Sequence, residues 1–473
     1  RIWGRHPEFS MKAFLISGDR SGSGKTSITL AIAAALAKRC TVQTFKVGMD
    51  YIDPSYLTGV TGRPCRNLDS FVMNRDEMTA VFNHACIGAD IAIIEGVRGL
   101  YEGADSIADI GSTASIAKHF HVPIILVIDA RSITRSAAAL LYGFMKFDPD
   151  VQIVGVILNN VRGEKHIRKA TEAIRHYCNI PVIGAIPRVD NLDLTMRHLG
   201  LVPFEEGLKD QPFLDRVSSI VEMICSHLDI DALLSLSREM KSSLHIPDLF
   251  ASVEQHHRER IAVARDEAFN FYYADLFSLI EARGYNIVYF SPIHGVLPDA
   301  DGYILGGGYP EYYGRELADN QSMMEDIRTA AKDERPILAE CGGLMYLCRE
   351  IDVLQDFSGL SAGTSFKMAD VLPARCTIPK KRVVTYVSGK TTPNFPFAEK
   401  PLPVKGHAFH YSTVHPDKGS TFGYELDRGF GIDATHDGMV LNKVVGSYTH
   451  IHPVPSRNLL YSFLSACLSD SSI

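Results

Sequence analysis

A glycine-rich stretch near the start of the chain has the residue types of a phosphate-binding loop. Gly22 and Gly24 precede Lys25 and Thr26, between an apolar run and an alanine-rich run. Glycines let several backbone N–H groups point inward, and the N-terminus of the following helix stabilises phosphate oxygens. Lys25 would reach the β- and γ-phosphates of a nucleotide, and Thr26 would hold Mg²⁺. Although the first glycine stands one place earlier than in the usual motif, the pattern favours nucleotide binding over an ordinary glycine turn.

Acidic and amide side chains follow the apolar runs that we expect to be strands of the same sheet. Asp50 and Asp53 come after the run at 42–47, and Glu95 ends a later run. Because ligands bind beyond the carboxyl ends of parallel strands, Glu95 would bind Mg²⁺, directly or through water. Asn159 follows another run, and its amide could read an adenine edge. Turn and helix-cap roles are the alternatives for the two aspartates, and a turn role is the alternative for Asn159.

Two arginines stand in a loop that is rich in turn residues. Arg63 lies between a glycine and a proline, and Arg66 follows three positions later. A guanidinium group can clamp a carboxylate through two parallel hydrogen bonds. We therefore expect Arg63 and Arg66 to hold carboxylates of a substrate, with a solvated loop as the alternative.

A cysteine in the second half has the surroundings of a catalytic nucleophile. Cys341 stands between an expected strand and an expected helix, and Gly342 follows it. Such an elbow exposes the sulfur, a helix N-terminus favours its thiolate, and the Gly342 N–H would stabilise an oxyanion. Gly308, in a run of three glycines, would supply the second oxyanion donor, and His450 at the end of a late strand would be the base. A buried core thiol is the alternative for Cys341, and a structural role is the alternative for His450.

The elements that must position these groups fall into two α/β halves. From Met11 to about Asp231, short apolar runs alternate with helical patterns, as strands buried on both faces require. The sequence predicts an α/β fold in which a P-loop, doubly wound parallel sheet is followed by a second α/β domain. We expect domains at 11–235 and 260–473 with a linker at 236–259. We interpret residues 1–10 as an expression remnant.

The composition indicates a globular protein without a nucleic-acid or membrane partner. The chain has 473 residues, with 48 basic and 55 acidic side chains and a net charge of −7, so a polyanion-binding surface is not expected. Its nine cysteines include no pair at metal-finger spacing, which favours a reducing cytoplasm over a disulfide framework. The apolar runs are far shorter than the ~20 residues that cross a bilayer. We therefore expect a cytoplasmic enzyme that acts on small molecules.

Five ordered motifs identify the chain as a member of a known family. They span residues 21–26, 46–54, 61–69, 95–100 and 305–311. In this combination they resemble the tetrapyrrole a,c-diamide synthases, which comprise cobyrinate a,c-diamide synthase and Ni-sirohydrochlorin a,c-diamide synthase. The resemblance runs from Met11 to about Ser465.

The resemblance implies a fold, a site and a mechanism. In the family the first domain is a P-loop synthetase similar to dethiobiotin synthetase, and the second is a class I-like glutaminase. Five residues would surround MgATP and the activated carboxylate: Lys25, Thr26, Asp50, Asp53 and Glu95. Cys341 would be the nucleophile of glutamine hydrolysis and His450 its base. ATP would convert an acetate of the tetrapyrrole into an acyl phosphate, ammonia from glutamine would attack it, and two rounds would give the diamide. The oligomeric state stays open, with a homodimer as one outcome.

The chain departs from the family pattern at several positions. His452 stands where class I glutaminases usually have a glutamate, so the resemblance implies a Cys–His dyad. Met49, Arg98 and Ala408 replace the proline, methionine and glutamate that are usual in the cobalamin branch. These changes lie beside expected substrate contacts and favour Ni-sirohydrochlorin as the substrate, with cobyrinate as the alternative. Arg98 and His407 are further candidates for holding the ring.

Two more distant functions remain as alternatives. Cobyric acid synthase shares the two-domain plan. A P-loop switch protein of the partitioning type would bind a partner and carry an inactive second domain. Cys341 with its glycines, together with His450, argues against the switch protein.

Overall fold

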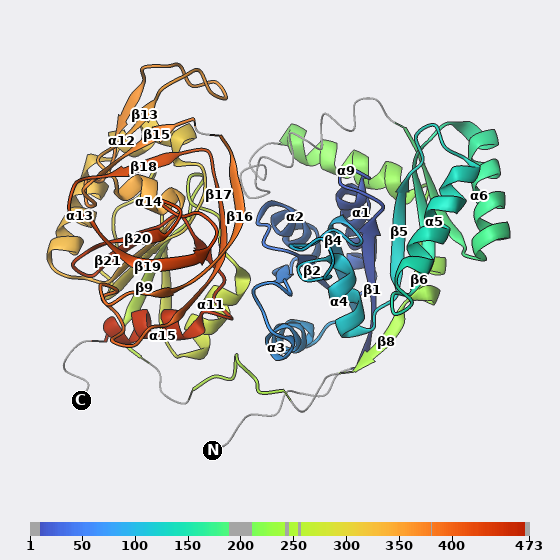
Figure 1. Ribbon diagram of the computed structural model, residues 1–473, viewed down its shortest axis with the longest axis horizontal. Coiled ribbons are helices and arrows are strands. Elements are labelled where there is room, and N and C mark those ends of the chain that lie inside the picture. Colours follow the sequence, from blue (N-terminus) through green and yellow to red (C-terminus); the bar gives the residue numbers. More distant parts are fainter. Residues whose placement is uncertain (1–9, 189–210, 242–245, 254–256, 380, 469–473) are drawn as a thin grey trace. The chain divides into compact units, whose positions relative to one another are not determined.

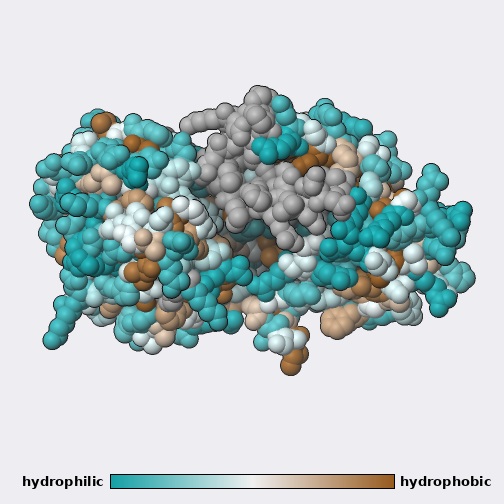
Figure 2. Space-filling model, turned by 90° about the horizontal axis from the view of Figure 1, so that it is seen from above, coloured by the Kyte–Doolittle hydropathy of each residue, from teal (hydrophilic) through white to brown (hydrophobic). Residues whose placement is uncertain are grey.

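The structure is a computed structural model that describes residues 10–188, 211–241, 246–253, 257–379 and 381–468, with the side chains of 211–214 left out. The chain divides into two compact units, at 1–249 and 250–473, and each has its own sheet (Figure 1). None of the helices in the described part of the chain is long and apolar enough to span a bilayer. On the face shown in Figure 2, hydrophilic residues predominate and hydrophobic ones are scattered among them.

The first unit is built on an eight-stranded sheet. Its strands are β1 (Ser10–Gly18), β2 (Val42–Val47), β3 (Arg66–Leu68), β4 (Ile91–Gly99), β5 (Ile124–Asp129), β6 (Ile153–Val161), β7 (Val182–Pro187) and β8 (Arg238–Lys241). Seven of them are parallel in the order β3-β2-β4-β1-β5-β6-β7. Successive residues Leu15 and Ile16 are both fully buried, so both faces of the sheet are covered. The predicted doubly wound parallel sheet is confirmed.

Helices cover this sheet. They are α1 (Lys25–Ala37), α2 (Ile52–Thr61), α3 (Arg75–Cys86), α4 (Thr113–Phe120), α5 (Arg135–Phe147), α6 (Gly163–Cys178), α9 (Gln211–Cys225) and α10 (Ile230–Leu236). Apolar side chains of α1, α2, α9 and α10 share one buried cluster with those of β1, β4 and β5. Burial of such side chains is the main favourable term that holds the layers together.

The strand β8 was not predicted. It runs antiparallel to the start of β1, with Ser10 opposite Lys241 and Ala13 opposite Arg238. The predicted linker at 236–259 therefore begins with a strand of the first unit. Ser10, which we assigned to the remnant, belongs to β1, while the rest of that remnant, 1–9, lies outside the described residues.

The second unit contains a ten-stranded sheet and a smaller sheet of four strands. The large sheet has the order β10-β9-β11-β12-β21-β20-β19-β16-β17-β22, and the small one the order β14-β13-β15-β18. The strands are β9 (Arg260–Ala264), β10 (Asn286–Phe290), β11 (Gly302–Leu305), β12 (Ile337–Glu340), β13 (Glu350–Val353), β14 (Ser365–Lys367), β15 (Ala374–Ile378), β16 (Val383–Thr391), β17 (Pro403–His410), β18 (Thr413–Pro416), β19 (Thr421–Arg428), β20 (His436–Leu441), β21 (Val444–Ser447) and β22 (His450–Ile451). The five strands from β10 to β21 in this order are parallel, and the later pairs are antiparallel.

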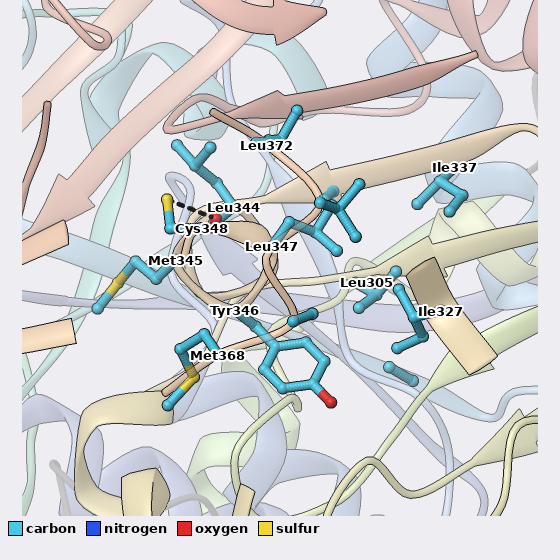
Figure 3. Close-up of a cluster of buried hydrophobic side chains, with 14 of the residues drawn as sticks. Leu305, Ile327, Ile337, Leu344, Met345, Tyr346, Leu347, Cys348, Met368 and Leu372 are labelled. Atoms are coloured by element: carbon cyan, nitrogen blue, oxygen red, sulfur yellow. Dashed lines mark hydrogen bonds between the residues drawn. The ribbon is translucent and has the colours of Figure 1, made fainter. Parts of the chain in front are cut away.

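The second unit also contains helices. They are α11 (Ala274–Ala282), the 3₁₀ helix η1 (Pro310–Tyr313), α12 (Gly314–Asp319), α13 (Gln321–Lys332), α14 (Gly342–Leu347) and α15 (Arg457–Ala466). Every residue of α14 is buried, and Figure 3 shows its side chains packed with those of Leu305, Ile327 and Leu372. This apolar packing anchors α14 and, with it, the turn that precedes it.

Candidate active sites

The predicted phosphate-binding loop connects β1 to α1 (Figure 1). Gly22 and Gly24 have φ angles of 78° and 92°, in the left-handed region that favours glycine. A Cβ on Gly24 would lie 2.1 Å from Nδ2 of Asn159. That Nδ2 donates a hydrogen bond to the Ser23 carbonyl at 2.9 Å. Asn159 therefore holds the loop from β6. Its amide was predicted to contact an adenine edge, and in the structure it contacts the Ser23 carbonyl.

Four polar side chains meet beside this loop, and we call them the Lys46 cluster: Thr26, Lys46, Asp53 and Glu95. The Lys46 ammonium donates to Asp53 Oδ2 at 2.6 Å and to Glu95 Oε1 at 2.7 Å. The Thr26 hydroxyl donates to Glu95 Oε1 at 2.7 Å and lies 3.3 Å from Asp53 Oδ2. The structure thus brings together three of the predicted magnesium ligands, and the fourth, Asp50, forms a hydrogen bond with Asp53.

Lys46 is the member of this cluster to which sequence reasoning gave no role. It lies on β2, whose six residues are all buried. A lysine in such a strand must have an acidic partner, because an unpaired buried charge is costly. That argument could have linked Lys46 to the acids at the ends of β2 and β4.

Charges in the cluster alter the pKa values of its members. Burial would raise the pKa of Asp53, but the charge and hydrogen bond of Lys46 outweigh it and lower that pKa. Burial and the charge of Asp53 raise the pKa of Asp50 to about 7, and protonated Asp50 donates to Asp53. Burial, followed by the charge of Lys46, lowers the pKa of Lys25. The site therefore holds two lysines against three carboxyl groups, one of which titrates near neutrality.

These residues fit a magnesium ion shared with a nucleotide. Glu95 Oε2 is buried and has no hydrogen-bond partner among the residues that the structure describes, and Thr26 and Asp53 contribute further oxygen atoms nearby. Within the described ranges, no three His, Cys, Asp or Glu side chains are arranged to hold a metal by themselves. Mg²⁺ in nucleotide sites is usually held by one or two carboxylates together with phosphate oxygens, so the donor set suits that role.

The predicted arginine ligands differ in how available they are. The Arg63 guanidinium donates to Gln43 Oε1 at 3.0 Å and to the carbonyls of Ala85 and Ile87 at 2.8 and 2.9 Å. Because its donors serve the protein itself, these contacts argue against Arg63 as a substrate clamp. Arg66 is buried in β3.

Arg98 is the exposed arginine of the three. It follows Glu95 on β4 and has a φ of 52°, in a region that non-glycine residues rarely adopt. An arginine in that place can meet a ligand beyond the carboxyl ends of the strands.

In the second unit, Cys341 occupies the sharp turn between β12 and α14. Its φ and ψ of 46° and −97° are unusual for a residue with a side chain, and such strain is often found at functional sites. The Cys341 N–H donates to the Ser447 carbonyl at 2.6 Å, and the Gly343 N–H donates to the Gly306 carbonyl at 3.0 Å. A Cβ on Gly343 would lie 2.2 Å from the Leu305 carbonyl oxygen. The elbow is therefore held closely against the ends of β11 and β21.

The two predicted oxyanion donors lie next to each other. A Cβ on Gly342 would be 3.1 Å from the Gly308 nitrogen. Gly308 has a φ of 152°, and a Cβ there would lie 2.0 Å from the Ala268 carbonyl oxygen. The Gly307 carbonyl accepts from the N–H groups of Asn270 and Phe271, both at 3.1 Å. These contacts fix the glycine run beside the start of α14.

His450 reaches the same place from β22. The Phe409 carbonyl lies 3.5 Å from the Cys341 sulfur and also forms a hydrogen bond with His450. A Cβ on Gly307 would lie 2.3 Å from Cε1 of His450, so the histidine packs directly on the glycine run. His407, which we expected to hold the tetrapyrrole, stacks on His450 with ring centroids 5.0 Å apart. The structure thus places His407 in the Cys341 site of the second unit.

Burial favours the neutral forms of both the Cys341 thiol and the His450 imidazole. Burial and the charge of Glu311 raise the pKa of the Cys341 thiol, although the Gly342 N–H acts in the opposite direction. The expected thiolate at the helix N-terminus is therefore disfavoured by burial. Burial and the charge of His407 lower the pKa of His450. A thiol beside a neutral imidazole suits transfer of the thiol proton to the histidine as the sulfur attacks.

A buried aspartate that sequence reasoning missed holds the segment that precedes His450. Asp437 accepts hydrogen bonds from the N–H groups of Tyr448 and Thr449 at 2.9 and 2.8 Å, and from the Thr449 hydroxyl at 2.6 Å. It thereby fixes the segment between β21 and β22, directly before His450. At the position where a glutamate is usual, His452 is fully buried, and its Nδ1 accepts from the Val454 N–H at 3.3 Å.

These two sites define the class of protein. A P-loop unit suits nucleotide binding, and a cysteine with a histidine and two oxyanion donors suits amide hydrolysis, so the chain combines a nucleotide-binding unit with a glutamine amidotransferase unit. Comparison with protein families agrees. Residues 14–202 match the CobQ/CobB/MinD/ParA nucleotide binding domain, and residues 260–457 match the CobB/CobQ-like glutamine amidotransferase domain.

Relatives of known name identify the family. Cobyrinate a,c-diamide synthase of Methanosarcina acetivorans is 46% identical, covering 97% of this chain and 95% of the relative. The enzymes of the same name from Methanosarcina barkeri and Methanosphaera stadtmanae are 46% and 40% identical, each covering 96% of this chain and 95% and 98% of the relative. The chain belongs to the cobyrinate a,c-diamide synthase family and is a glutamine-hydrolysing ligase, which confirms the predicted family, fold class and enzyme type.

Proposed function

We propose that this enzyme amidates the a and c acetate groups of cobyrinate, with ATP as the energy source and glutamine as the nitrogen source. The observation that carries the proposal is the presence in one chain of a P-loop with the Lys46 cluster and of the Cys341 site. The names of the relatives support cobyrinate as the substrate.

In the first unit, the acetate must be activated, because the carbon of a free carboxylate is a poor electrophile for ammonia. The acetate oxygen attacks the γ-phosphorus of ATP, a new O–P bond forms, the bond to the bridging oxygen breaks and ADP leaves. Lys25 and Lys46 supply positive charge where negative charge develops. Thr26, Asp53 and Glu95 would hold Mg²⁺, which neutralises phosphate charge when bound.

In the second unit, glutamine supplies ammonia. The Cys341 thiol passes its proton to His450 as the sulfur attacks the amide carbon, and the oxyanion faces the N–H groups of Gly308 and Gly342. His450 returns the proton to the leaving ammonia, and water then hydrolyses the thioester to glutamate. Ammonia attacks the acyl phosphate and expels phosphate, and a second round amidates the other acetate.

Ni-sirohydrochlorin is the second candidate substrate. It is favoured by Met49 and Arg98, which depart from the usual cobalamin pattern at the ends of β2 and β4. The third departure, Ala408, is fully buried on β17 and offers no surface to a ring. Incubating the enzyme with ATP and glutamine on each ring, and following the mass shift of amidation, tests both. Product from Ni-sirohydrochlorin alone would overturn cobyrinate as the substrate.

The two-site scheme has its own test. Cys341→Ala should abolish amidation driven by glutamine and leave amidation driven by high ammonium intact, because the first unit needs only ammonia. Cys348→Ala is the matched control: this thiol, one residue beyond α14, bonds to the Leu344 carbonyl (Figure 3). Equal loss with both nitrogen sources in Cys341→Ala would contradict the scheme.

A further inference from the structure

A buried carboxylate near Cys341 has no cationic partner among the residues that the structure describes. Glu311, in the 3₁₀ helix η1, is 5% exposed. Its Oε2 has no hydrogen-bond partner among the described residues, and within the same part of the chain no basic side chain forms an ion pair with it. Burial raises the pKa of Glu311 to about 7, against the effect of its own backbone N–H. A protein keeps such a costly group where a ligand completes it.

The chain sets this carboxylate beside the oxyanion donors. Pro310 directly precedes Glu311, and its Cδ lies 3.1 Å from the position of a Cβ on Gly342. Of the charged groups that act on the Cys341 thiol, Glu311 has the largest effect, and it also acts on the Tyr309 hydroxyl. Glu311 therefore directly follows the residue that packs against the Gly342 oxyanion donor, and its charge acts on the nucleophilic thiol.

We propose that Glu311 binds the α-ammonium group of glutamine in the Cys341 site. The inference rests on the proposed function, because it takes glutamine as the nitrogen source. The thiol needs only the side-chain amide, which many small molecules contain. An amide that lacks the ammonium group would leave the buried carboxylate unpaired, so the site would reject it. A site that leaves a polar group unpaired discriminates between substrates more strongly than one that loses only an apolar contact.

Occupation of this site would also affect the nucleophile. Glu311, Glu340 and Asp437 all act to raise the pKa of Cys341, together with burial, while the Gly342 N–H acts against them. A bound ammonium group would cancel the contribution of Glu311. The thiol would then release its proton to His450 more readily when glutamine is present than when the site contains water.

The test compares two amides in the complete reaction with ATP and tetrapyrrole. Glutaramate has the amide and the carboxylate of glutamine but lacks the α-amino group. We expect wild-type enzyme to prefer glutamine by roughly 10- to 100-fold in kcat/KM, the range of a charged hydrogen bond. Glu311→Gln should lose most of this preference, with kcat/KM for glutaramate almost unchanged.

Controls separate recognition from damage to the fold. Glu316→Gln changes an exposed carboxylate in the adjacent helix α12 and should leave the preference intact. Equal use of both amides by wild-type enzyme would overturn the inference, even if Glu311→Gln failed to fold. An equal loss of kcat/KM with both amides in Glu311→Gln would also overturn it. Failure of wild-type enzyme with glutamine and with ammonium would overturn the proposed function, and this inference with it.

Discussion

Replacing Lys46 with methionine should strongly destabilise the first unit. The Lys46 side chain is 3% exposed and lies 2.6 Å from Asp53 Oδ2 and 2.7 Å from Glu95 Oε1. Removing one partner of a buried ion pair costs about 3–5 kcal/mol, because the remaining charge stays buried. For a unit the size of 1–249, each kcal/mol shifts the Tm by about 2–4 °C, so calorimetry should record a fall of roughly 6–20 °C.

Lys118→Met is a matched control for this measurement. Lys118 also contacts two carboxylates, Asp109 at 2.8 Å and Asp148 at 2.6 Å, but its side chain is 28% exposed. Surface ion pairs contribute about 0–1 kcal/mol each, so this variant should lose only a few degrees. The two lysines differ in burial and have the same number of carboxylate partners. Equal shifts in Tm would refute the reasoning.

The effect of Lys46→Met should also depend on pH. In the wild-type protein the pKa of Asp53 is lowered, so its contribution to stability is present above its ordinary pKa and is lost as the pH falls through the lowered value. Without Lys46, burial would raise the folded-state pKa of Asp53 and raise that of Glu95 further. The variant would then lose stability as the pH rises from the ordinary pKa of a carboxyl group through the raised folded-state values. A difference from wild type that is constant over this range would contradict the assignment.

Three further variants test other parts of the two sites. Gly307→Ala should abolish glutamine-driven but not ammonium-driven amidation, because the added Cβ would lie 2.3 Å from Cε1 of His450. If this variant still used glutamine, the result would argue against His450 as the base. Arg98→Ala should raise the KM for the tetrapyrrole, because it removes a charged hydrogen bond that contributes roughly 1.5–3 kcal/mol of binding free energy. Arg63→Ala should lower the Tm and leave that KM unchanged. The reverse pattern would restore Arg63 as a substrate ligand. Glu95→Gln should slow ATP-dependent amidation ~10²–10³-fold with either nitrogen source, and near-native kinetics would place the magnesium site elsewhere.

Sequence reasoning succeeded where the relevant signal is local. A glycine-rich turn between a strand and a helix, and a cysteine at a similar elbow, are defined by neighbours in the chain. Alternating apolar runs predicted the parallel sheet because strands covered on both faces must be apolar at nearly every position. The two turns that carry Lys25 and Cys341 could therefore be located before any contact was known.

Contacts between distant segments could not be found in this way. Asp437 bonds to backbone groups of Tyr448 and Thr449, and no residue pattern distinguishes such an acid from one on the surface. Arg63 was expected to clamp a substrate carboxylate because it stands in a glycine–proline loop. Its guanidinium instead donates to Gln43 and to carbonyls at the end of α3 and just beyond it. A side chain's partner is decided by tertiary packing, which spacing alone does not encode.

The strand β8 decides where this chain can be cut. A gene fragment that ends at 235, where apolar periodicity places the boundary, would remove β8 and leave Ser10–Ala13 without its antiparallel neighbour. An exposed strand edge invites pairing with other chains, so such a fragment should precipitate when it is produced alone. A fragment that continues through Lys241 keeps all eight strands. A fragment that contains the complete sheet of the first unit therefore extends a few residues into the segment that we predicted to be a linker.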